Sequence, residues 1–377
     1  WEPDRPAALH EMARKDDFLL TFKAGAYNKE GVIDTERLAE AVAQMKTVKV
    51  PHYLMTTWLL VLTWVGGLGL LTSLGMAICG VLDWSVPVWW ATLQFFVVYA
   101  CCAKPLRWLG KVATPLSNSL KGYASLVALL QQTPFETELN RKLQQQLKGA
   151  DVSFMQLQRL LQGLDSRGNV IGLMLFDAFL LYDIFLVRRF GRWQQQCMAD
   201  IGKWMEVLAR FDALVSMATM WRNHPEGAEA EIVPGNEVEY KAEGLYHPFL
   251  GRKARKNDFY IAEGQYHIIT GANMAGKSTF LRAVGINYVL AINGLPVCAD
   301  HMRVTNFQLF SSMRTQDDLT LGISYFNAEL LRLKQLVDYV QASQRPTLII
   351  LDEILKGTNS ADKLNGSRMF LQAMMQL

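Results

Sequence analysis

A glycine-rich segment in the C-terminal half carries the residues best suited to chemistry. Residues 271–279 have the G-x-x-x-x-G-K-[ST] spacing of a phosphate-binding loop. Glycines let backbone N–H groups curl around phosphate oxygens, the lysine reaches the β- and γ-phosphates, and the serine hydroxyl ligates Mg²⁺. We therefore predict a site for a nucleoside triphosphate and Mg²⁺ rather than a glycine-rich turn without a ligand. The predicted binding residues are Gly271, Ala272, Asn273, Met274, Ala275, Gly276, Lys277, Ser278 and Thr279.

Two acidic residues downstream supply the other half of such a site. Residues 347–353 read Thr-Leu-Ile-Ile-Leu-Asp-Glu, an apolar run that ends in two carboxylates. The run predicts a buried parallel strand with the acids at its C-terminal edge. Asp352 would hold Mg²⁺ through water together with Ser278, and Glu353 would polarise the attacking water, which indicates hydrolysis. The alternative is a strand that ends in a solvated acidic turn.

These residues need strands and a helix to position them. We expect a short apolar strand over 266–270 before the loop and a helix over 280–290 after it. Further strands are predicted at 237–240 and 258–261. Strands that alternate with helices from about residue 231 onward favour an α/β domain.

The preceding region shows the spacing of helices. One apolar stripe and its continuation have i, i+3, i+4 spacing and predict buried helix faces. Residues 170–187 are almost wholly apolar but contain Asp177 and Asp183, so we predict a buried helix there, with a third membrane span as the alternative. The two stripes consist of Leu120, Tyr123, Leu126, Val127 and Leu130, then Leu143, Leu147, Phe154, Leu157, Leu160 and Leu161.

A sharply apolar region lies at residues 53–103, where Asp83 is the only charged residue. Its two runs, 53–82 and 88–103, flank a turn at 83–87 and suit two membrane-spanning helices. Lysines and arginines on both sides put both ends in the cytoplasm, which predicts an inner (cytoplasmic) membrane protein with the C-terminal domain on the cytoplasmic side. A hairpin buried in a soluble core, and hence a cytoplasmic protein, is the alternative. The flanking cations are Lys46, Lys49, Lys104, Arg107 and Lys111.

Overall composition narrows the possibilities only slightly. The 377 residues carry a net charge of +3, which indicates no particular partner, and their number suggests two or three domains. The five cysteines have no metal-binding spacing and fit a reducing interior. Because the chain opens on Trp1 and stops soon after Glu353, we expect a fragment cut at both ends.

Three motifs together resemble the MutS mismatch-repair ATPases. Residues 268–279 are similar to that family's ATP-binding loop with its Asn-Met pair. Residues 351–358 are similar to its second acidic motif, Asp-Glu-Ile followed by a Gly-Thr turn. Residues 317–329 resemble its signature segment with a Ser-x-Phe-x-x-Glu core.

The resemblance and the apolar hairpin together predict a mixed fold: an α-helical N-terminal and lever region with a two-helix transmembrane hairpin, then an α/β P-loop NTPase domain of ABC/MutS type. The implied domains are a short helical soluble segment at 1–50, the transmembrane hairpin at 51–104 and a helical core or lever domain at 105–230. A C-terminally truncated MutS-type P-loop ATPase domain follows at 231–377.

The resemblance also implies a homodimer with ATP sites shared between two copies. Ser324 would contact the γ-phosphate in trans, so the predicted catalytic residues are Lys277, Glu353 and Ser324. A simple helix cap is the alternative role for Ser324. The segment 246–248, Tyr-His-Pro, resembles the family's strand near the adenine, although His247 by itself favours a structural role.

Departures from the family pattern leave two functions open. The chain has no mismatch-reading N-terminal domain and ends before the family's switch histidine and dimerisation helices, so it resembles a shorter, membrane-associated MutS-related branch. The first hypothesis is an ATP-hydrolysing, DNA-binding protein linked to DNA mismatch repair or DNA-structure sensing. The second is a membrane-anchored P-loop ATPase with a protein or lipid partner. An ABC transporter subunit is weaker, because the Leu-Ser-Gly-Gly-Gln signature is missing.

Overall fold

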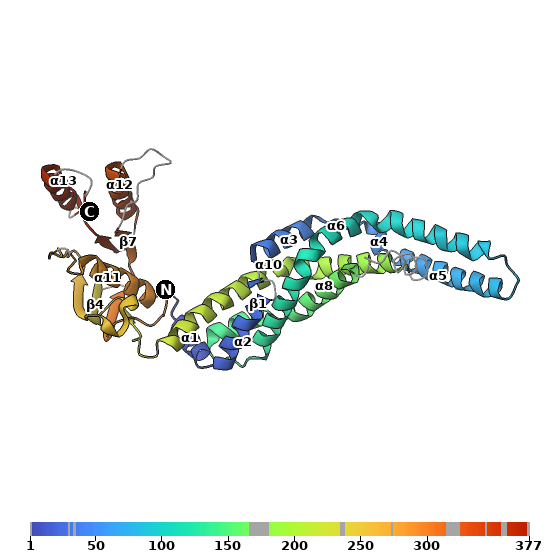
Figure 1. Ribbon diagram of the computed structural model, residues 1–377, viewed down its shortest axis with the longest axis horizontal. Helices are drawn as coiled ribbons and strands as arrows, with labels where there is room; N and C mark the ends of the chain where they lie inside the picture. The colour runs from blue at the N-terminus through green and yellow to red at the C-terminus, as the bar shows by residue number, and fades with distance from the viewer. Residues whose placement is uncertain are drawn as a thin grey trace. The chain divides into compact units, whose positions relative to one another are not determined.

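The chain divides into two compact units, one of residues 15–215 and one of residues 1–14 together with 216–377. The computed structural model in Figure 1 describes residues 2–28, 31–32, 35–165, 181–233, 238–272, 274–313, 325–343, 345–355 and 360–374.

The unit of residues 15–215 is built mainly from helices. Among its described residues, a small sheet pairs β1 (Tyr27–Asn28) with β2 (Gly31–Val32) in antiparallel fashion. Its helices are α2 (Asp16–Ala26), α3 (Thr35–Thr47), α4 (His52–Met55), α5 (Thr57–Ile78), α6 (Ser85–Gln132), α7 (Glu138–Gln146), α8 (Ala150–Asp165) and α10 (Tyr182–Asn223) up to Val215.

The core of this helical unit lies between α6, α8 and α10. Every member of the two predicted apolar stripes is buried, from Leu120 on α6 to Leu161 on α8. Trp193 of α10 donates from Nε1 to the carbonyl oxygen of Ser153 on α8 at 3.2 Å, which joins these two helices. The prediction that both stripes form helix core is confirmed.

The apolar stretch at 170–187 can be followed only in part. Residues 170–180, including Asp177, lie outside the described residues. From Tyr182 the chain is helical, and Ile184, Leu186 and Val187 are buried. Over these residues the predicted buried helix is confirmed.

The apolar hairpin of residues 53–103 forms two helices, α5 and the first part of α6, which Figure 1 shows side by side. Both are long and apolar enough to cross a membrane, over Thr57–Ile78 and Ser85–Gly110. The turn lies earlier than predicted, because Pro87 is inside the first turn of α6. Proline is tolerated there, since the first N–H groups of a helix have no intrahelical acceptor.

The second unit combines a mixed sheet, a two-stranded sheet and several helices. Its strands are β3 (Glu231–Val233), β4 (Glu239–Leu245), β5 (Asn257–Ala262), β6 (His301–Thr305), β7 (Gln308–Ser312) and β8 (Thr347–Leu351). Its helices are α1 (Arg5–Ala13), the end of α10, the 3₁₀ helix η2 (Pro248–Lys253), α11 (Lys277–Ile292), α12 (Tyr325–Ala342) and α13 (Ser360–Met374).

Strand pairing gives a four-stranded sheet in the order β3-β6-β4-β5. β3 is parallel to β6, and β4 is antiparallel to both β6 and β5. β7 and β8 pair in parallel as a separate sheet, so the predicted parallel strand at 347–351 is confirmed. One core contains residues from α11, the four-stranded sheet and β8, including Tyr240, Tyr288, Met302 and Ile350.

Three predicted strands differ from those in the structure. The strand expected at 237–240 is β4 and runs over 239–245, whereas the one at 258–261 is β5 with one more residue at each end. The strand predicted at 266–270 is wrong: these residues have no regular structure. Tyr266 and Ile268 are exposed, and no described strand pairs with the segment, so apolar composition alone does not make it a strand.

Candidate functional site

The glycine-rich loop leads directly into α11. Residues 274–276 form a turn, and the helix predicted over 280–290 is present as α11, which begins three residues earlier, at Lys277. The N–H of Ala275 donates to the carbonyl oxygen of Ala272 at 3.2 Å, which closes the turn. The loop is therefore a compact curl at the N-terminus of a helix, the arrangement that phosphate binding requires.

Backbone angles show why glycine is needed in this loop. Gly276 has φ 96°, a left-handed conformation that residues with a Cβ adopt only at a cost. Met274 also has a positive φ of 65°, and its side chain is fully exposed. A non-glycine residue in this region is uncommon and tends to occur where function requires the backbone shape.

The Lys277 ammonium lies against the loop that precedes it. Its Nζ donates to the carbonyl oxygens of Gly271 at 2.9 Å and Ala272 at 2.8 Å. Both acceptors belong to the predicted phosphate-binding segment, so the loop's own carbonyls hold the cation within it. A positive charge held there is suited to phosphate oxygens that enter the loop.

The first turn of α11 provides backbone N–H groups as hydrogen-bond donors. Its N-cap is Gly276, and no side chain caps the helix there. The N–H groups of Lys277, Ser278 and Thr279 belong to the first turn, where no intrahelical acceptor exists. Together with the helix dipole, they favour an anion at this position.

The acidic pair follows β8 without a gap. The N–H of Asp352 donates to the carbonyl oxygen of Ser312 at 2.9 Å, which extends the parallel pairing of β7 and β8 by one bond. Asp352 is half-buried, whereas Glu353 is exposed and turns the chain with φ 58°. The strand thus ends where the carboxylates begin.

Direct packing joins the element that carries the lysine to the element that carries the acids. A Cβ at Gly285 of α11 would lie 3.2 Å from the Cδ1 atom of Ile350 on β8, a tight approach. Gly285 is two helical turns after Lys277, and Ile350 is two residues before Asp352. The close packing of α11 on β8 therefore fixes the two halves of the site relative to each other.

Two predicted site residues lie outside the described residues. These are Asn273 in the loop and Ser324 just before α12. Their predicted roles stay predictions.

Two buried tyrosines that the sequence did not point to support α11. Tyr240 donates from its hydroxyl to the carbonyl oxygen of Val284 on α11 at 3.0 Å. Tyr288 donates to the carbonyl oxygen of Phe307, and its ring stacks on the Phe307 ring at 4.2 Å between centroids. Burial raises the pKa of both hydroxyls, that of Tyr288 to about 12. Both therefore remain neutral donors.

A buried asparagine ties the middle of α11 to the neighbouring loops. Asn287 donates from Nδ2 to the carbonyl oxygen of Tyr246 at 3.0 Å and accepts from the N–H of Cys298 at 2.6 Å. His247 accepts from the N–H of Phe249 at its Nδ1 and caps η2, which gives it a structural role. A polar residue on an apolar helix face was the sequence signal that could have identified Asn287.

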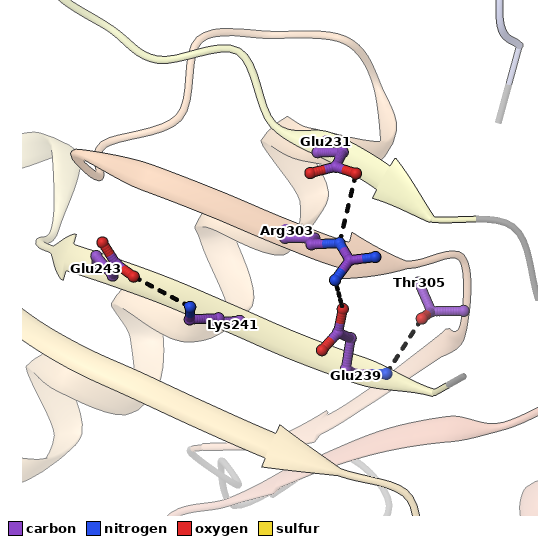
Figure 2. A network of polar contacts seen from close by, with 6 residues as sticks. All are labelled: Glu231, Glu239, Lys241, Glu243, Arg303 and Thr305. Atoms are coloured by element: carbon purple, nitrogen blue, oxygen red, sulfur yellow. Dashed lines mark hydrogen bonds and ion pairs between the residues drawn. The ribbon is translucent and has the colours of Figure 1, made fainter.

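A charged network on β3, β6 and β4 orders the four-stranded sheet (Figure 2). Figure 2 shows Arg303 between Glu231, at 3.4 Å, and Glu239, at 2.9 Å. Thr305 accepts from the N–H of Glu239 at 3.1 Å. A polar residue at every second position of β4 and β6 was the available sequence signal. These contacts join β3, β6 and β4.

The C-terminal end of α11 is also fixed. Trp221, near the end of α10, donates from Nε1 to the carbonyl oxygen of Gly294 at 2.8 Å. Arg5 of α1 donates to Oδ1 of Asn293 at 3.1 Å. The helix that begins at the loop is thus bonded at its far end to two other helices of the same unit.

The part of the chain that contains the loop and the acidic pair is similar to known proteins. The family model for MutS domain V matches residues 267–376. The chain is 34% identical over 170 residues to the DNA mismatch repair protein MutS of Persephonella marina, covering 44% of this chain and 19% of that protein. The MutS proteins of Anaplasma phagocytophilum (34%, covering 44% and 20%) and Halothermothrix orenii (33%, covering 44% and 18%) are similar to the same extent.

These matches are partial in both directions. They cover less than half of this chain, and the chain spans about a fifth of the length of these relatives. For the C-terminal part, the family recognised from the three motifs is confirmed.

Proposed function

Because the C-terminal part of this chain is a MutS-family domain, we propose that the chain binds and hydrolyses ATP with Mg²⁺ as a MutS-type protein. One observation carries the proposal. The Lys277 ammonium lies in a phosphate-binding loop at the start of α11, and α11 packs on the strand that ends at Asp352 and Glu353. A lysine in the loop and carboxylates on an adjoining strand are the two halves of an ATP-hydrolysing site.

Each residue has a definite chemical task in this proposal. Backbone N–H groups of the loop and of the first turn of α11 surround the phosphates, and Lys277 neutralises the charge on the β- and γ-oxygens. Ser278 and Asp352 would hold Mg²⁺, which would supply positive charge beside the phosphate oxygens. Glu353 orients and polarises the water that attacks the γ-phosphorus.

The proposal includes a homodimer with shared sites. In a single copy of the chain, Met274 is fully exposed, so this side of the loop faces solvent. A second copy would cover this surface and bring its own Ser324 to the γ-phosphate. Transition-state charge would then be stabilised from both sides, so hydrolysis would depend on pairing of the two copies.

Replacing the lysine tests the site directly. Lys277→Ala should weaken binding of a fluorescent ATP analogue with Mg²⁺ by about 10- to 100-fold, because a hydrogen bond to a charged group contributes about 1.5–3 kcal/mol. Phosphate release should fall to background. Lys334→Ala on the exposed face of α12 is the matched control and should behave as the unaltered chain. Unaltered affinity and turnover in Lys277→Ala would refute the proposed site.

DNA is the partner that the relatives suggest. They are named DNA mismatch repair proteins, and we extend that link to this chain, as binding to DNA or sensing of its structure. The stretch from Lys104 to Arg222 has fifteen lysines and arginines against nine aspartates and glutamates, an excess too mild to indicate nucleic-acid binding by itself.

A second candidate is a membrane-anchored ATPase whose partner is a protein or a lipid and which does not recognise mismatches. The observation that favours it is the exposed apolar surface of α5 and α6. Both candidates hydrolyse ATP, so only DNA binding separates them.

A further inference from the structure

The helical hairpin of α5 and the first part of α6 has its large apolar side chains on the outside. Only 17% of the most apolar stretch of each helix is buried. Trp58 is 80% exposed and Trp89 is 72% exposed. Figure 1 shows the hairpin extending past the ends of α8 and α10, so no other described helix of its unit lies alongside its outer half. The exposed set also includes Val61, Leu62, Trp64, Val65, Leu68, Leu71, Met76, Ile78, Val88, Leu93, Phe96 and Val97.

Two glycines of α5 lie where the two helices approach each other. A Cβ at Gly69 would lie 2.9 Å from Cζ2 of Trp90, and one at Gly66 would lie 2.5 Å from Nε2 of Gln94. Trp90 donates from Nε1 to the carbonyl oxygen of Gly66 at 3.2 Å. The glycines therefore let α6 approach the backbone of α5 closely, and we call this contact the glycine seam.

Buried hydroxyls on α5 are satisfied within that helix. Thr63 donates to the carbonyl oxygen of Leu60 at 2.7 Å, and Ser73 donates to that of Leu70 at 2.8 Å. Glycine and hydroxyl-bearing residues at the contact, with many bulky apolar residues exposed on the outside, are typical of helix pairs in lipid. A hairpin in water would show the reverse, because large apolar surface drives burial.

Length and flanking residues fit a bilayer. The 22 residues of α5 rise about 33 Å at ~1.5 Å per residue, close to the ~30 Å hydrocarbon core. Asp83 lies in the turn between the helices, beside Trp84. The cations at the open end of the hairpin complement anionic lipid headgroups, as the positive-inside rule requires; they are Lys46, Lys49, Lys104 and Arg107.

The distribution of exposed residues decides between lipid and protein. A partner helix or groove would cover one face of each helix and leave a polar face to water. On α5, the consecutive pairs Val61–Leu62 and Trp64–Val65 are exposed, and such neighbours point in directions about 100° apart. The exposed apolar surface of α5 is therefore wider than the narrow stripe that one partner helix would cover, which suits a fluid hydrocarbon medium.

We propose that α5 and residues 85–103 of α6 cross a lipid bilayer as a pre-packed hairpin held by the glycine seam. The turn between the helices then lies on the far side of the membrane. The segments that flank the hairpin lie on the near side. This inference does not depend on ATP binding at Lys277 and can fail or hold separately from it.

Cysteine accessibility in the full chain tests the crossing. Cys79 is an exposed residue in the turn. In one version Cys79 is the only cysteine; in a second, cysteine-free version, Lys142→Cys places a thiol on the exposed face of α7. Bacterial spheroplasts that produce each version are treated with a membrane-impermeant maleimide, before and after permeabilisation. Membranes are then washed with alkaline carbonate.

Crossing predicts labelling of Cys79 in intact spheroplasts and labelling of the Lys142→Cys thiol only after permeabilisation. Both versions should stay in the carbonate-washed membranes. Release of the chain by carbonate would overturn the proposal, and so would labelling of both thiols only after permeabilisation. Binding of ATP by the same membranes is measured in parallel, so a failed hairpin is distinguished from a failed nucleotide site.

Paired glycine variants test the seam. Gly69→Leu places a side chain against the Trp90 ring, whereas Gly75→Leu meets nothing within 4 Å. We expect Gly69→Leu to lower the labelled fraction of Cys79 in intact spheroplasts at least several-fold and Gly75→Leu to leave it unchanged. Equal labelling in the two variants would show that the seam does not hold the hairpin. If Gly69→Leu fails to accumulate while Gly75→Leu accumulates normally, the seam is required for the hairpin to form.

Discussion

At the scale of single residues, Lys277 shows how the loop keeps its shape. Its ammonium satisfies the carbonyl oxygens of Gly271 and Ala272, two groups that would otherwise repel phosphate. A nucleotide that binds here exchanges these bonds for bonds to its own oxygens. The lysine therefore contributes both to the form of the loop and to the charge that a triphosphate meets.

Glu353 should separate hydrolysis from binding. We expect Glu353→Gln to keep ATP affinity within a few-fold and to lower turnover by about 10²- to 10⁴-fold, since the amide cannot act as a general base. Single-turnover phosphate release measures the loss, and equilibrium titration measures the affinity.

Glu263→Gln, in the exposed turn after β5, is the matched control for Glu353→Gln and should hydrolyse ATP normally. The proposed role of Glu353 would be wrong if Glu353→Gln lost ATP binding together with turnover. It would be equally wrong if both variants retained full turnover.

At the scale of elements, α11 is the part that organises the site. Tyr240 bonds to its backbone, Asn287 ties its middle to neighbouring loops, and Trp221 bonds to the residue just beyond its end. A helix restrained at this many points has little independent motion. Its N-terminal N–H groups therefore stay in position to bind phosphate.

Gly285 should be intolerant of larger residues because α11 packs so closely on β8. Gly285→Val places branched carbons against Ile350, and overpacking of this kind costs about 1–3 kcal/mol of stability. We expect a lower unfolding midpoint and weaker ATP binding. The double variant Gly285→Val with Ile350→Ala should recover part of both.

The control for this helix–strand contact is Gly202→Val on α10, where a Cβ meets nothing within 4 Å. Because Gly202 is also helical, it reports the effect of valine on a helix without the clash. If Gly202→Val and Gly285→Val shifted the unfolding midpoint equally, packing against Ile350 would not be the cause.

Local sequence patterns predicted some of these elements and missed others for a physical reason. The helix after the loop and the strand before Asp352 follow from spacing along the chain, and both are present. The segment 266–270 looked like a strand, yet strand formation depends on a pairing partner that a local pattern does not contain. Tyr240 and Tyr288 were missed because their hydrogen bonds join residues far apart in sequence.

At the scale of the whole molecule, the match to a known protein family lies in one of the two units. The family match covers residues 267–376, inside the unit that contains the loop and the acids. The helical unit of residues 15–215 carries the apolar hairpin and most of the stretch with excess positive charge. The two candidate functions thus differ in what the helical unit would contact: DNA in the first, and a membrane with a protein or lipid partner in the second.

DNA binding should reveal that partner. If the chain acts on DNA, titration of the full chain with homoduplex, mismatched and branched DNA should give measurable affinity, with log K falling linearly as log salt rises. The mild charge excess predicts few phosphate contacts and hence a shallow slope. Fluorescence anisotropy with and without ATP measures both quantities.

Failure to bind any of these DNAs at low salt would favour the membrane-anchored ATPase with a protein or lipid partner. The Lys277→Ala variant serves as the control for ATP effects on DNA affinity, since it should show DNA binding without a response to nucleotide.

Helix α6 has a consequence for how two copies would meet. It runs unbroken from Ser85 to Gln132, so the same rod that lies in the proposed bilayer continues about 33 Å beyond Gly110 at ~1.5 Å per residue. A rigid helix of this kind limits rotation of the helical unit and holds that unit at a fixed distance from the membrane. Copies anchored in this way would search for each other by lateral diffusion in two dimensions, at a raised effective concentration. Pairing could then be controlled by how densely the membrane is populated, with no change in the affinity of one copy for another.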